Sequence, residues 1–465
     1  MTIPYTQFIN EEEIGRILEQ NQKPTPSKVR YVLSKAKEMK GLDLEDVAVL
    51  THISDSMQLF ELFETANHIK EKVYGKRLVI FAPLYISNFC SNECSYCAFR
   101  TKNELIDRKS LTQAQIVLNT EKLIREGHRR VLLVAGDVYP NHDFQYVLDS
   151  IASIYEAKVG KGEIRRVNIN VAPLEVDEFK LLRDAKIGTY QLFQETYHRE
   201  TYNEVHLEGK KKDYEFRITS LHRAMEAGIE NVGTGVLFGL YNFRFELLAL
   251  MQHIKELETV YGIGPHTISI PRIEPATGST FAANLPYAVS DLNYRKIIAI
   301  LRLAVPYTGI IMSTRESANM RRESFALGVS QISAGTQSTP GGIKQNTQDK
   351  DKSECSLGDH RSLDEVVRDI AEMGYIPSFC NSCHRLGRTG LDFMDMAKPG
   401  NIKNHCNPNA ISTFQEYLMD YASYQTRLIG EDLIDDVLDS MEGSALERAL
   451  ILLEKVKKGK RDIYC

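Results

Sequence analysis

The sequence predicts an α/β protein whose largest part is a closed (β/α)8 barrel of the TIM type. Three observations support this prediction. Eight short β-rich runs alternate with amphipathic stretches of helical length. Polar and charged residues follow the ends of most of these runs, which is where barrel enzymes carry their active sites. The chain, at 465 residues, also exceeds what one hydrophobic core usually serves, so additions at the ends are expected. A doubly wound open sheet is the alternative.

Residues 1–76 are predicted to form an N-terminal helical extension, because apolar residues recur there at helical spacing. The barrel is predicted to span 77–361, and a mainly helical C-terminal region 362–465. Within the last part of the barrel, 335–361 is so poor in apolar residues that a loop or linker is expected. The helical segments of the two flanking regions are 12–18, 29–39, 44–50 and 57–73, then 410–421, 431–441 and 445–457.

The predicted barrel strands are rich in β-branched and apolar residues, as strands covered on both faces should be. Two of the helices between and after them open with the pattern of a capping box, Ser110 with Gln113 and Ser362 with Glu365. The strands are 78–86, 130–135, 167–172, 188–193, 232–239, 267–271, 309–313 and 328–333. The helices are 111–126, 144–157, 176–185, 214–227, 245–261, 291–303, a weaker one after Glu316, and 362–373.

Composition narrows the class of protein. Hydrophobic residues make up 43% and charged residues 26% of the chain, which are ordinary values for a globular protein. Lys plus Arg number 57 against 62 Asp plus Glu, so there is no basic excess for a nucleic acid. No export signal or membrane-spanning run is apparent, and a soluble cytoplasmic protein with reduced cysteines is expected.

The first cysteine group follows the first predicted strand with the spacing C-x3-C-x2-C, formed by Cys90, Cys94 and Cys97. Three thiolates on a short loop can hold three irons of a [4Fe–4S] cluster and leave the fourth without a protein ligand. A structural zinc site is the alternative, but it prefers four protein ligands, and no histidine lies within twenty residues of this loop.

This spacing resembles the radical S-adenosylmethionine (SAM) enzymes. The resemblance implies that SAM chelates the open iron, and that its reductive cleavage yields a 5′-deoxyadenosyl radical. It also implies that Tyr96, the aromatic residue before the last cysteine, packs near the adenine. The remaining candidates for cofactor binding lie at predicted strand ends and are Gly136, Asp137, Asn170 and Gln194.

The second cysteine group is C-x2-C-x22-C, formed by Cys380, Cys383 and Cys406, with His384 and His405 adjacent. From spacing alone it fits a second Fe–S cluster and a Cys3His zinc site equally well. Together with the segments 81–88, 192–198 and 264–269, this group makes the chain similar to the HydG family, the tyrosine-cleaving radical SAM maturases of [FeFe]-hydrogenase. The similarity covers nearly the whole chain, whereas the tyrosine lyase of thiazole synthesis is similar over the barrel only and lacks the second cluster.

The resemblance implies a lyase that cleaves L-tyrosine at Cα–Cβ to p-cresol and dehydroglycine. A second [4Fe–4S] cluster, with a labile extra iron, a free cysteine and His266 as a ligand, would then yield carbon monoxide and cyanide as an Fe(CO)2(CN) unit for the hydrogenase H-cluster. Other hydrogenase maturation proteins and an electron donor such as ferredoxin or flavodoxin are the implied partners. Both clusters would share one closed cavity.

Substrate binding calls for a cation at a strand end, because the tyrosine carboxylate suits the fork of a guanidinium group. Arg315 and Arg272 are the candidates, and Glu195 is the third predicted catalytic residue. For each arginine, a structural ion pair is the alternative.

The chain departs from the family at three places. They are Asp137, where Glu is usual, Glu274, where a basic residue is common, and Thr336–Gln337. These departures lie near the expected cavity and are the basis of a second hypothesis, a divergent lyase, either of the thiazole-synthesis type or acting on another substrate, whose second cluster only relays electrons. A non-catalytic Fe–S scaffold is the third.

Overall fold

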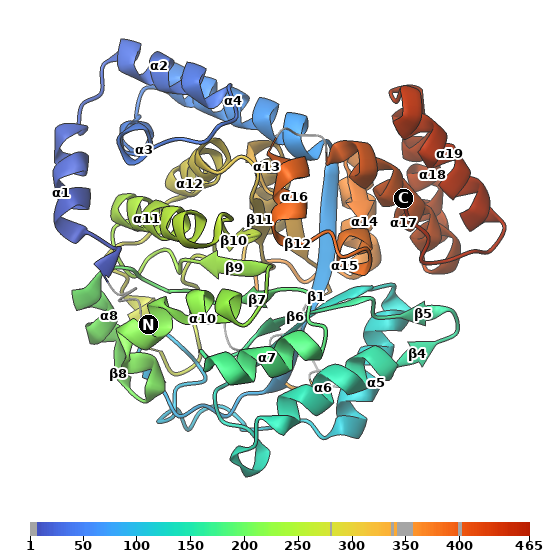
Figure 1. The fold of residues 1–465 in the computed structure, drawn as a ribbon, viewed down its shortest axis with the longest axis horizontal. Helices are drawn as coiled ribbons and strands as arrows, with labels where there is room; N and C mark the ends of the chain where they lie inside the picture. The colour runs from blue at the N-terminus through green and yellow to red at the C-terminus, as the bar shows by residue number, and fades with distance from the viewer. Residues whose placement is uncertain (1–6, 280, 336–338, 342–356, 399–401) are drawn as a thin grey trace.

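The computed structural model describes residues 7–279, 281–335, 339–341, 357–398 and 402–465 (Figure 1). Most of the predicted loop 335–361, including Thr336, Gln337 and Cys355, lies outside the described residues. The seven cysteines that are described are all free thiols, in keeping with the expected reduced state.

Eight parallel strands form the centre of the molecule, and all eight were predicted. They follow one another in chain order around the sheet, and the last strand also pairs with the first, so the barrel is closed and the open-sheet alternative is wrong. The strands are β1 (Arg77–Ser87), β3 (Arg130–Ala135), β6 (Arg166–Asn170), β7 (Tyr190–Gln191), β9 (Val232–Gly235), β10 (Thr267–Ser269), β11 (Gly309–Met312) and β12 (Gln331–Ser333).

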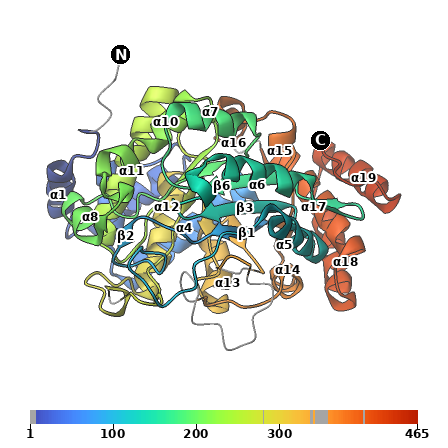
Figure 2. The same cartoon turned by 90° about the horizontal axis from the view of Figure 1, so that it is seen from below.

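Helices surround the barrel and cover the outward faces of its strands (Figures 1 and 2). Their apolar faces and the outer side chains of the strands form the two largest hydrophobic clusters, and burial of this surface stabilises the fold. The surrounding helices are α5 (Gln113–Glu126), α6 (Gln145–Glu156), α7 (Val176–Asp184), α9 (Tyr214–Ile218), α10 (Ser220–Glu226), α11 (Phe243–Tyr261), α12 (Asp291–Ala304) and α13 (Ala318–Leu327).

The N-terminal extension packs on one side of the barrel, against α11, α12 and α13 (Figure 1). Its last helix brings Tyr74 to the barrel, where the phenol donates a hydrogen bond of 2.5 Å to the carbonyl of Tyr307. The extension consists of α1 (Glu11–Gln20), α2 (Pro26–Ala36), α3 (Leu44–Thr51) and α4 (Ser56–Tyr74), close to the four predicted segments.

The C-terminal region is mainly helical, but it returns to the barrel through one further strand, β13 (Ile376–Ser378). This strand pairs in parallel with Arg77–Val79, the N-terminal end of β1. The segment after β13 is therefore delivered to the N-terminal end of the barrel, opposite the loops that follow the strands. The helices of this region are α14 (Leu363–Glu372), α15 (Ser382–Arg385), α16 (Gly390–Ala397), α17 (Lys403–Asp420), α18 (Tyr424–Asp439) and α19 (Gly443–Lys457).

Two local predictions need correction, and two short strand pairs were not predicted. The capping box of α5 is formed by Thr112 with Gln115, because the hydroxyl of Ser110 bonds instead to Ser87 at 2.8 Å; the box of Ser362 with Glu365 is confirmed. The predicted helix 214–227 breaks at Thr219 into α9 and α10. Short pairs of strands outside the barrel were not predicted: β2 (Glu93–Cys94) with β8 (His206–Glu208), which follows α8 (Arg199–Val205), and β4 (Lys158–Val159) with β5 (Gly162–Glu163).

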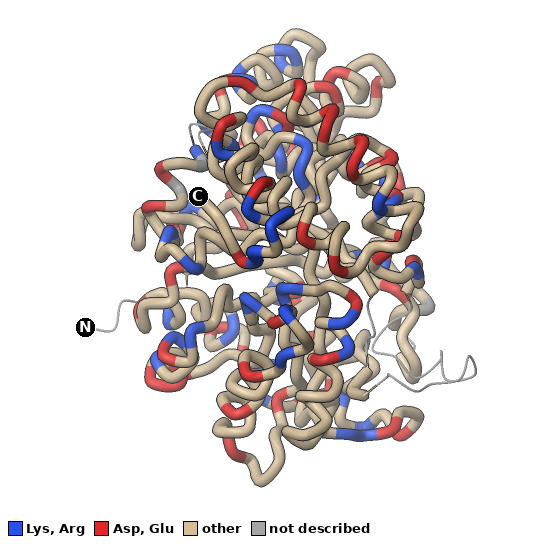
Figure 3. Tube along the Cα trace, turned by 90° about the vertical axis from the view of Figure 1, so that its right-hand side faces the viewer, with Lys and Arg blue, Asp and Glu red and all other residues tan. Residues whose placement is uncertain are grey.

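Lys and Arg alternate with Asp and Glu along the chain trace on the side that Figure 3 shows, which accords with the small net charge. None of the helices in the described ranges is both long and apolar enough to cross a membrane.

Arg302 is expected to contribute strongly to stability. Its side chain is fully buried in α12, and the guanidinium donates hydrogen bonds of 2.7 to 3.2 Å to the carbonyls of Pro306, Thr308 and Gly328. Arg302→Met leaves these carbonyls unsatisfied, so the free energy of unfolding in urea should fall by about 3–5 kcal/mol. The exposed Arg125→Met is the control and should change it by less than about 0.5 kcal/mol. Equal losses in the two variants would contradict this assignment.

Candidate functional site

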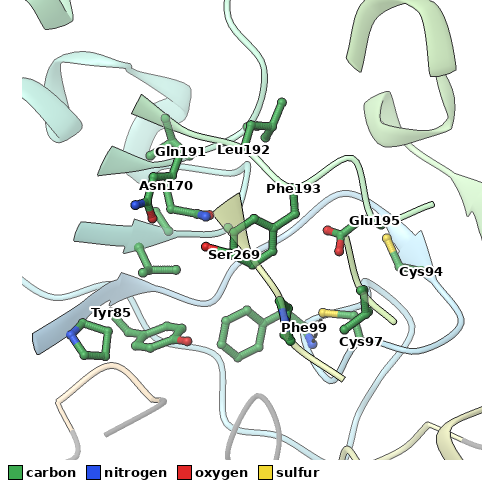
Figure 4. A pocket seen from close by; sticks show the side chains of 18 of the residues that line it. Tyr85, Cys94, Cys97, Phe99, Asn170, Gln191, Leu192, Phe193, Glu195 and Ser269 are labelled. Carbon is green, nitrogen blue, oxygen red and sulfur yellow. Dashed lines mark hydrogen bonds between the residues drawn. The ribbon is translucent and has the colours of Figure 1, made fainter. Parts of the chain in front are cut away.

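The larger described cavity lies at the C-terminal ends of the barrel strands and has a volume of about 260 Å³; we call it the upper cavity (Figure 4). Strand residues such as Tyr85, Asn170, Gln191 and Ser269 project into it. Nine of the predicted site residues line this cavity, although their roles stay predictions. They are Cys90, Cys94, Cys97, Tyr96, Gly136, Asp137, Asn170, Glu195 and Arg315.

The first cysteine loop is fastened to the end of β3 by Asp137. One carboxylate oxygen accepts the backbone N–H of Ser91 at 2.6 Å, and the other accepts the Ser91 hydroxyl at 2.6 Å and the Asn92 amide at 2.7 Å. Gly136 permits this close approach, because a Cβ there would lie 2.0 Å from the carbonyl oxygen of Phe89. Asp137 therefore holds the loop in place, in addition to any contact with a cofactor.

Tyr96 is anchored from the opposite side by His206. Because Nδ1 of His206 lies 2.8 Å from the carbonyl oxygen of Tyr202, that nitrogen must carry the proton. Nε2 is then the acceptor for the phenol of Tyr96 at 2.9 Å. Burial lowers the pKa of His206 well below its ordinary value, so the imidazole stays neutral. The β2–β8 pair, in which Cys94 faces His206, holds the two segments together.

Glu195 combines an unusual backbone with a paired charge. Its φ of 72° lies in the left-handed region, which is uncommon for a residue other than glycine and is often found at functional sites. The carboxylate contacts Lys211 at 2.6 Å and Arg217 at 3.3 Å. Burial alone would raise the pKa of Glu195, but these two cations hold it below its ordinary value. Lys211 also lies 5.5 Å from the centre of the Tyr96 ring.

Two predicted residues, Arg272 and Gln194, are not among those that line the upper cavity. Arg272 bonds bidentately to Glu316, at 2.8 and 2.5 Å, and contacts Asp291 at 2.8 Å. The contacts of Arg272 are therefore those of a structural ion pair, the alternative to substrate binding, and they do not support a role in binding the substrate.

The second cavity, of about 60 Å³, lies at the opposite end of the barrel; we call it the lower cavity. The two cysteine groups therefore line two separate cavities, and not the one shared cavity that was expected. The lining of the lower cavity comes from the first residues of several strands and from the segment after β13. All four residues of the predicted second site line it, namely Cys380, Cys383, Cys406 and His266. Four arginines join them, Arg77, Arg130, Arg166 and Arg388.

The lower cavity favours one thiolate and a neutral imidazole. The hydrogen bond from Cys406 lowers the pKa of Cys383 to about 6, and the nearby guanidinium groups of Arg77 and Arg166 act in the same direction. The same hydrogen bond raises the pKa of Cys406, and burial raises that of Cys380. Burial, together with those cations, lowers the pKa of His266 to about 3, and its Nδ1 has no hydrogen-bond partner among the described residues. A neutral imidazole with an available nitrogen is what a metal ligand requires.

Both cysteine triplets offer the thiolate donors that Fe–S clusters use. Within the described ranges, no group of three or more His, Cys, Asp and Glu side chains is arranged to hold one metal ion. Sulfur atoms in both groups accept hydrogen bonds typical of cluster thiolates, from Asn92 to Cys90 at 3.4 Å, from Phe99 to Cys97 at 3.3 Å, and from Ser382 to Cys380 at 3.4 Å.

Several residues of these sites were not predicted from the sequence. His206, Lys211 and Arg217 belong to segments after the fourth strand, and the run Lys210–Lys212 has the pattern of an ordinary solvated loop. The arginines of the lower cavity did leave a signal, because Arg77, Arg130 and Arg166 each begin a buried strand. A repeated cation at the start of apolar strands indicates an anionic group inside the barrel.

Comparison with known proteins identifies the family. The Radical SAM superfamily model matches residues 84–254, and the Biotin and Thiamin Synthesis associated domain matches residues 269–376. The first of these implies a [4Fe–4S] cluster that works with SAM. The 2-iminoacetate synthase of Escherichia coli is 28% identical, over 77% of this chain and 92% of that protein.

Two solved structures cover almost the full length. A HydG described as a maturase of the [FeFe]-hydrogenase has 44% identity and a TM-score of 0.95, over 98% of this chain and all of that one. The HydG from Carboxydothermus hydrogenoformans has 36% identity and a TM-score of 0.85, over 97% of this chain and all of that one. The chain belongs to the HydG family of [FeFe]-hydrogenase maturases, within the radical SAM superfamily.

Proposed function

We propose that the protein is a tyrosine lyase that supplies an iron carbonyl cyanide unit to the hydrogenase H-cluster. L-Tyrosine would be cleaved in the upper cavity to p-cresol and dehydroglycine, and dehydroglycine would be converted to carbon monoxide and cyanide in the lower cavity. The single observation that carries the proposal is that two cysteine triplets open into two cavities at opposite ends of one barrel. The relative named 2-iminoacetate synthase supports the first step, because 2-iminoacetate is dehydroglycine.

In the upper cavity, Cys90, Cys94 and Cys97 would hold a [4Fe–4S] cluster, which with SAM supplies the 5′-deoxyadenosyl radical. The chain's own groups bind and orient. Arg315 lies near Glu195 and Glu274, since it affects the pKa of both, and it would take the tyrosine carboxylate. Apolar side chains from several strands enclose the rest of the cavity and exclude water from the radical; they include Phe81, Leu132, Val134, Phe193 and Ile311.

In the lower cavity, Cys380, Cys383 and Cys406 would hold the second cluster, and His266 would hold the labile iron. The cavity's arginines would balance the charge of that cluster and of a carboxylate fragment. We also propose that the chain has three regions, with boundaries after residues 76 and 361, and that ferredoxin or flavodoxin is the reductant.

Glu274 lines the upper cavity at a position where a basic residue is common in the family. A different substrate would be accommodated at this position.

The test is anaerobic reconstitution with iron and sulfide, followed by dithionite, SAM and tyrosine. We expect p-cresol in solution and infrared bands of iron-bound carbon monoxide and cyanide. Formation of 5′-deoxyadenosine without p-cresol would show that tyrosine is the wrong substrate. Formation of p-cresol without carbon monoxide or cyanide would favour the second candidate, a lyase whose C-terminal cluster relays electrons.

Arg315→Met should weaken tyrosine binding. A charge-assisted hydrogen bond to a carboxylate contributes about 1.5–3 kcal/mol, so the KM for tyrosine should rise about 10- to 100-fold. Cleavage of SAM without tyrosine, which does not need this contact, should persist. Arg272→Lys is the matched control, because it keeps the charge of an arginine that does not line the cavity. An unchanged KM in Arg315→Met, or an equal rise in Arg272→Lys, would remove Arg315 from the substrate site.

A further inference from the structure

The interior of the barrel between the two cavities is polar, which is unusual. In a TIM-type barrel this space is normally filled by layers of branched apolar side chains. Here Gln191 lines the upper cavity and Gln331 lines the lower cavity, while Thr267 on β10 is buried and lines neither of them. The amide of Gln191 donates a hydrogen bond of 3.4 Å to the hydroxyl of Thr267. We call these three side chains the partition.

The side chains of the partition pack against two glycines, Gly233 and Gly309, which stand at one level of the barrel. Strand register pairs Gln191 with Gly233, Gly233 with Thr267, and Thr267 with Gly309, so these four residues form a continuous arc around the interior. A Cβ at Gly233 would lie 2.5 Å from the hydroxyl oxygen of Thr267, and one at Gly309 would lie 2.7 Å from the amide nitrogen of Gln331. The side chains of the partition thus occupy space that exists only because both residues are glycine.

We propose that the partition is a gate that admits a small polar fragment to the lower cavity and retains the aryl product above it. The inference rests on the proposed function and concerns how its two reactions are connected. Dehydroglycine carries an imine and a carboxylate, which can replace the hydrogen bond between Gln191 and Thr267 as the fragment passes. The ring of p-cresol is wider than dehydroglycine, and its apolar carbons would leave the two amides and the hydroxyl of the partition unsatisfied.

The side chains that form the gate can move without disturbing the barrel. Gln191 and Gln331 are long, and their amides are terminal groups whose rotation leaves the strand hydrogen bonds intact. Gly309 provides the space for the amide of Gln331, and Gly233 provides the space for the hydroxyl of Thr267 and the side chain of Gln191. Extra volume at Gly309 would therefore push the amide of Gln331 into the passage before it displaced the backbone.

Gly309→Ala is the decisive variant. Gly309 has no left-handed φ, and its added Cβ would collide chiefly with the flexible end of Gln331; its next contacts are at 3.4 Å, ordinary van der Waals distances. We expect p-cresol to form within about twofold of the wild-type rate, because the upper cavity is unchanged, and iron-bound carbon monoxide to appear at least about tenfold more slowly. Dehydroglycine held above the gate would take up water and leave as glyoxylate and ammonia, in the amount by which carbon monoxide falls.

The double variant Gly309→Ala/Gln331→Ala tests the cause. Removing the colliding amide should restore the rate of carbon monoxide formation, a coupling that general damage to the fold would not produce. Gly15→Ala, at a helical glycine with nothing within 4 Å of its added Cβ, is the matched control and should behave as wild type.

Three results would overturn the gate. They are carbon monoxide formation at the wild-type rate in Gly309→Ala, a parallel loss of p-cresol in that variant, and no recovery in the double variant. Failure of the wild-type protein to form p-cresol would instead contradict the proposed function itself, and the gate with it. The two failures are therefore distinguished by the wild-type control.

Discussion

Cys94→Ala is expected to abolish both halves of the reaction. Cys94 is buried, lines the upper cavity and is fixed in the β2–β8 pair opposite His206, so no other described thiol can replace it without moving that pair. Without its third thiolate the first cluster is lost, and 5′-deoxyadenosine, p-cresol and iron-bound carbon monoxide should all fall to background. Iron should fall by about four atoms per chain, while the second cluster remains.

Cys465→Ala is the control, because it removes a free thiol that lines neither the upper nor the lower cavity. This variant should keep the wild-type iron content and the wild-type rates of product formation. Were Cys94→Ala to retain SAM cleavage, or were Cys465→Ala to lose iron as well, the assignment of the first cluster to Cys90, Cys94 and Cys97 would fail. Because the readouts are iron content and three products, a merely unstable variant is recognised by its loss of both clusters.

The barrel could be predicted from the sequence because its signals are local. Each strand is a short apolar run bounded by turn residues, and each covering helix has one apolar face, so all eight strands were found. The lengths of the strands could not be predicted as well, because β7 has only two residues where six were predicted. Capping was harder, since Ser110 and Thr112 both carry a suitable hydroxyl and only the pairing of Ser110 with Ser87 decides between them.

The site residues that could be predicted are those that lie at strand ends or belong to a sequence motif. The two cysteine triplets have their own spacing, and Asn170 and Arg315 follow directly from strand ends. Arg272 and Gln194 do not line the cavity, and the contacts of Arg272 with Glu316 and Asp291 join separate segments, which a strand pattern does not reveal. His206, Lys211 and the partition residues act through contacts between distant segments, and such contacts leave no local pattern in the sequence.

Cys406→Ala should separate the two reactions. Cys406 lies on α17 and lines the lower cavity together with Cys380, Cys383 and His266, and none of these residues lines the upper cavity. The first cluster and its loop are therefore untouched, and p-cresol should form within about twofold of the wild-type rate. Iron-bound carbon monoxide and cyanide should be absent, because two thiolates do not hold a four-iron cluster securely and the labile iron then has no support.

The different losses in Cys94→Ala and Cys406→Ala would establish that the two ends of the barrel perform different chemistry. Cys94→Ala loses every product but keeps the second cluster, whereas Cys406→Ala keeps p-cresol and the first cluster. If Cys406→Ala still gave iron-bound carbon monoxide, the lower cavity would not be where it forms, and the polar partition between the cavities would have no fragment to admit. If it lost p-cresol as well while keeping the iron of the first cluster, the second cluster would be an electron relay to the first.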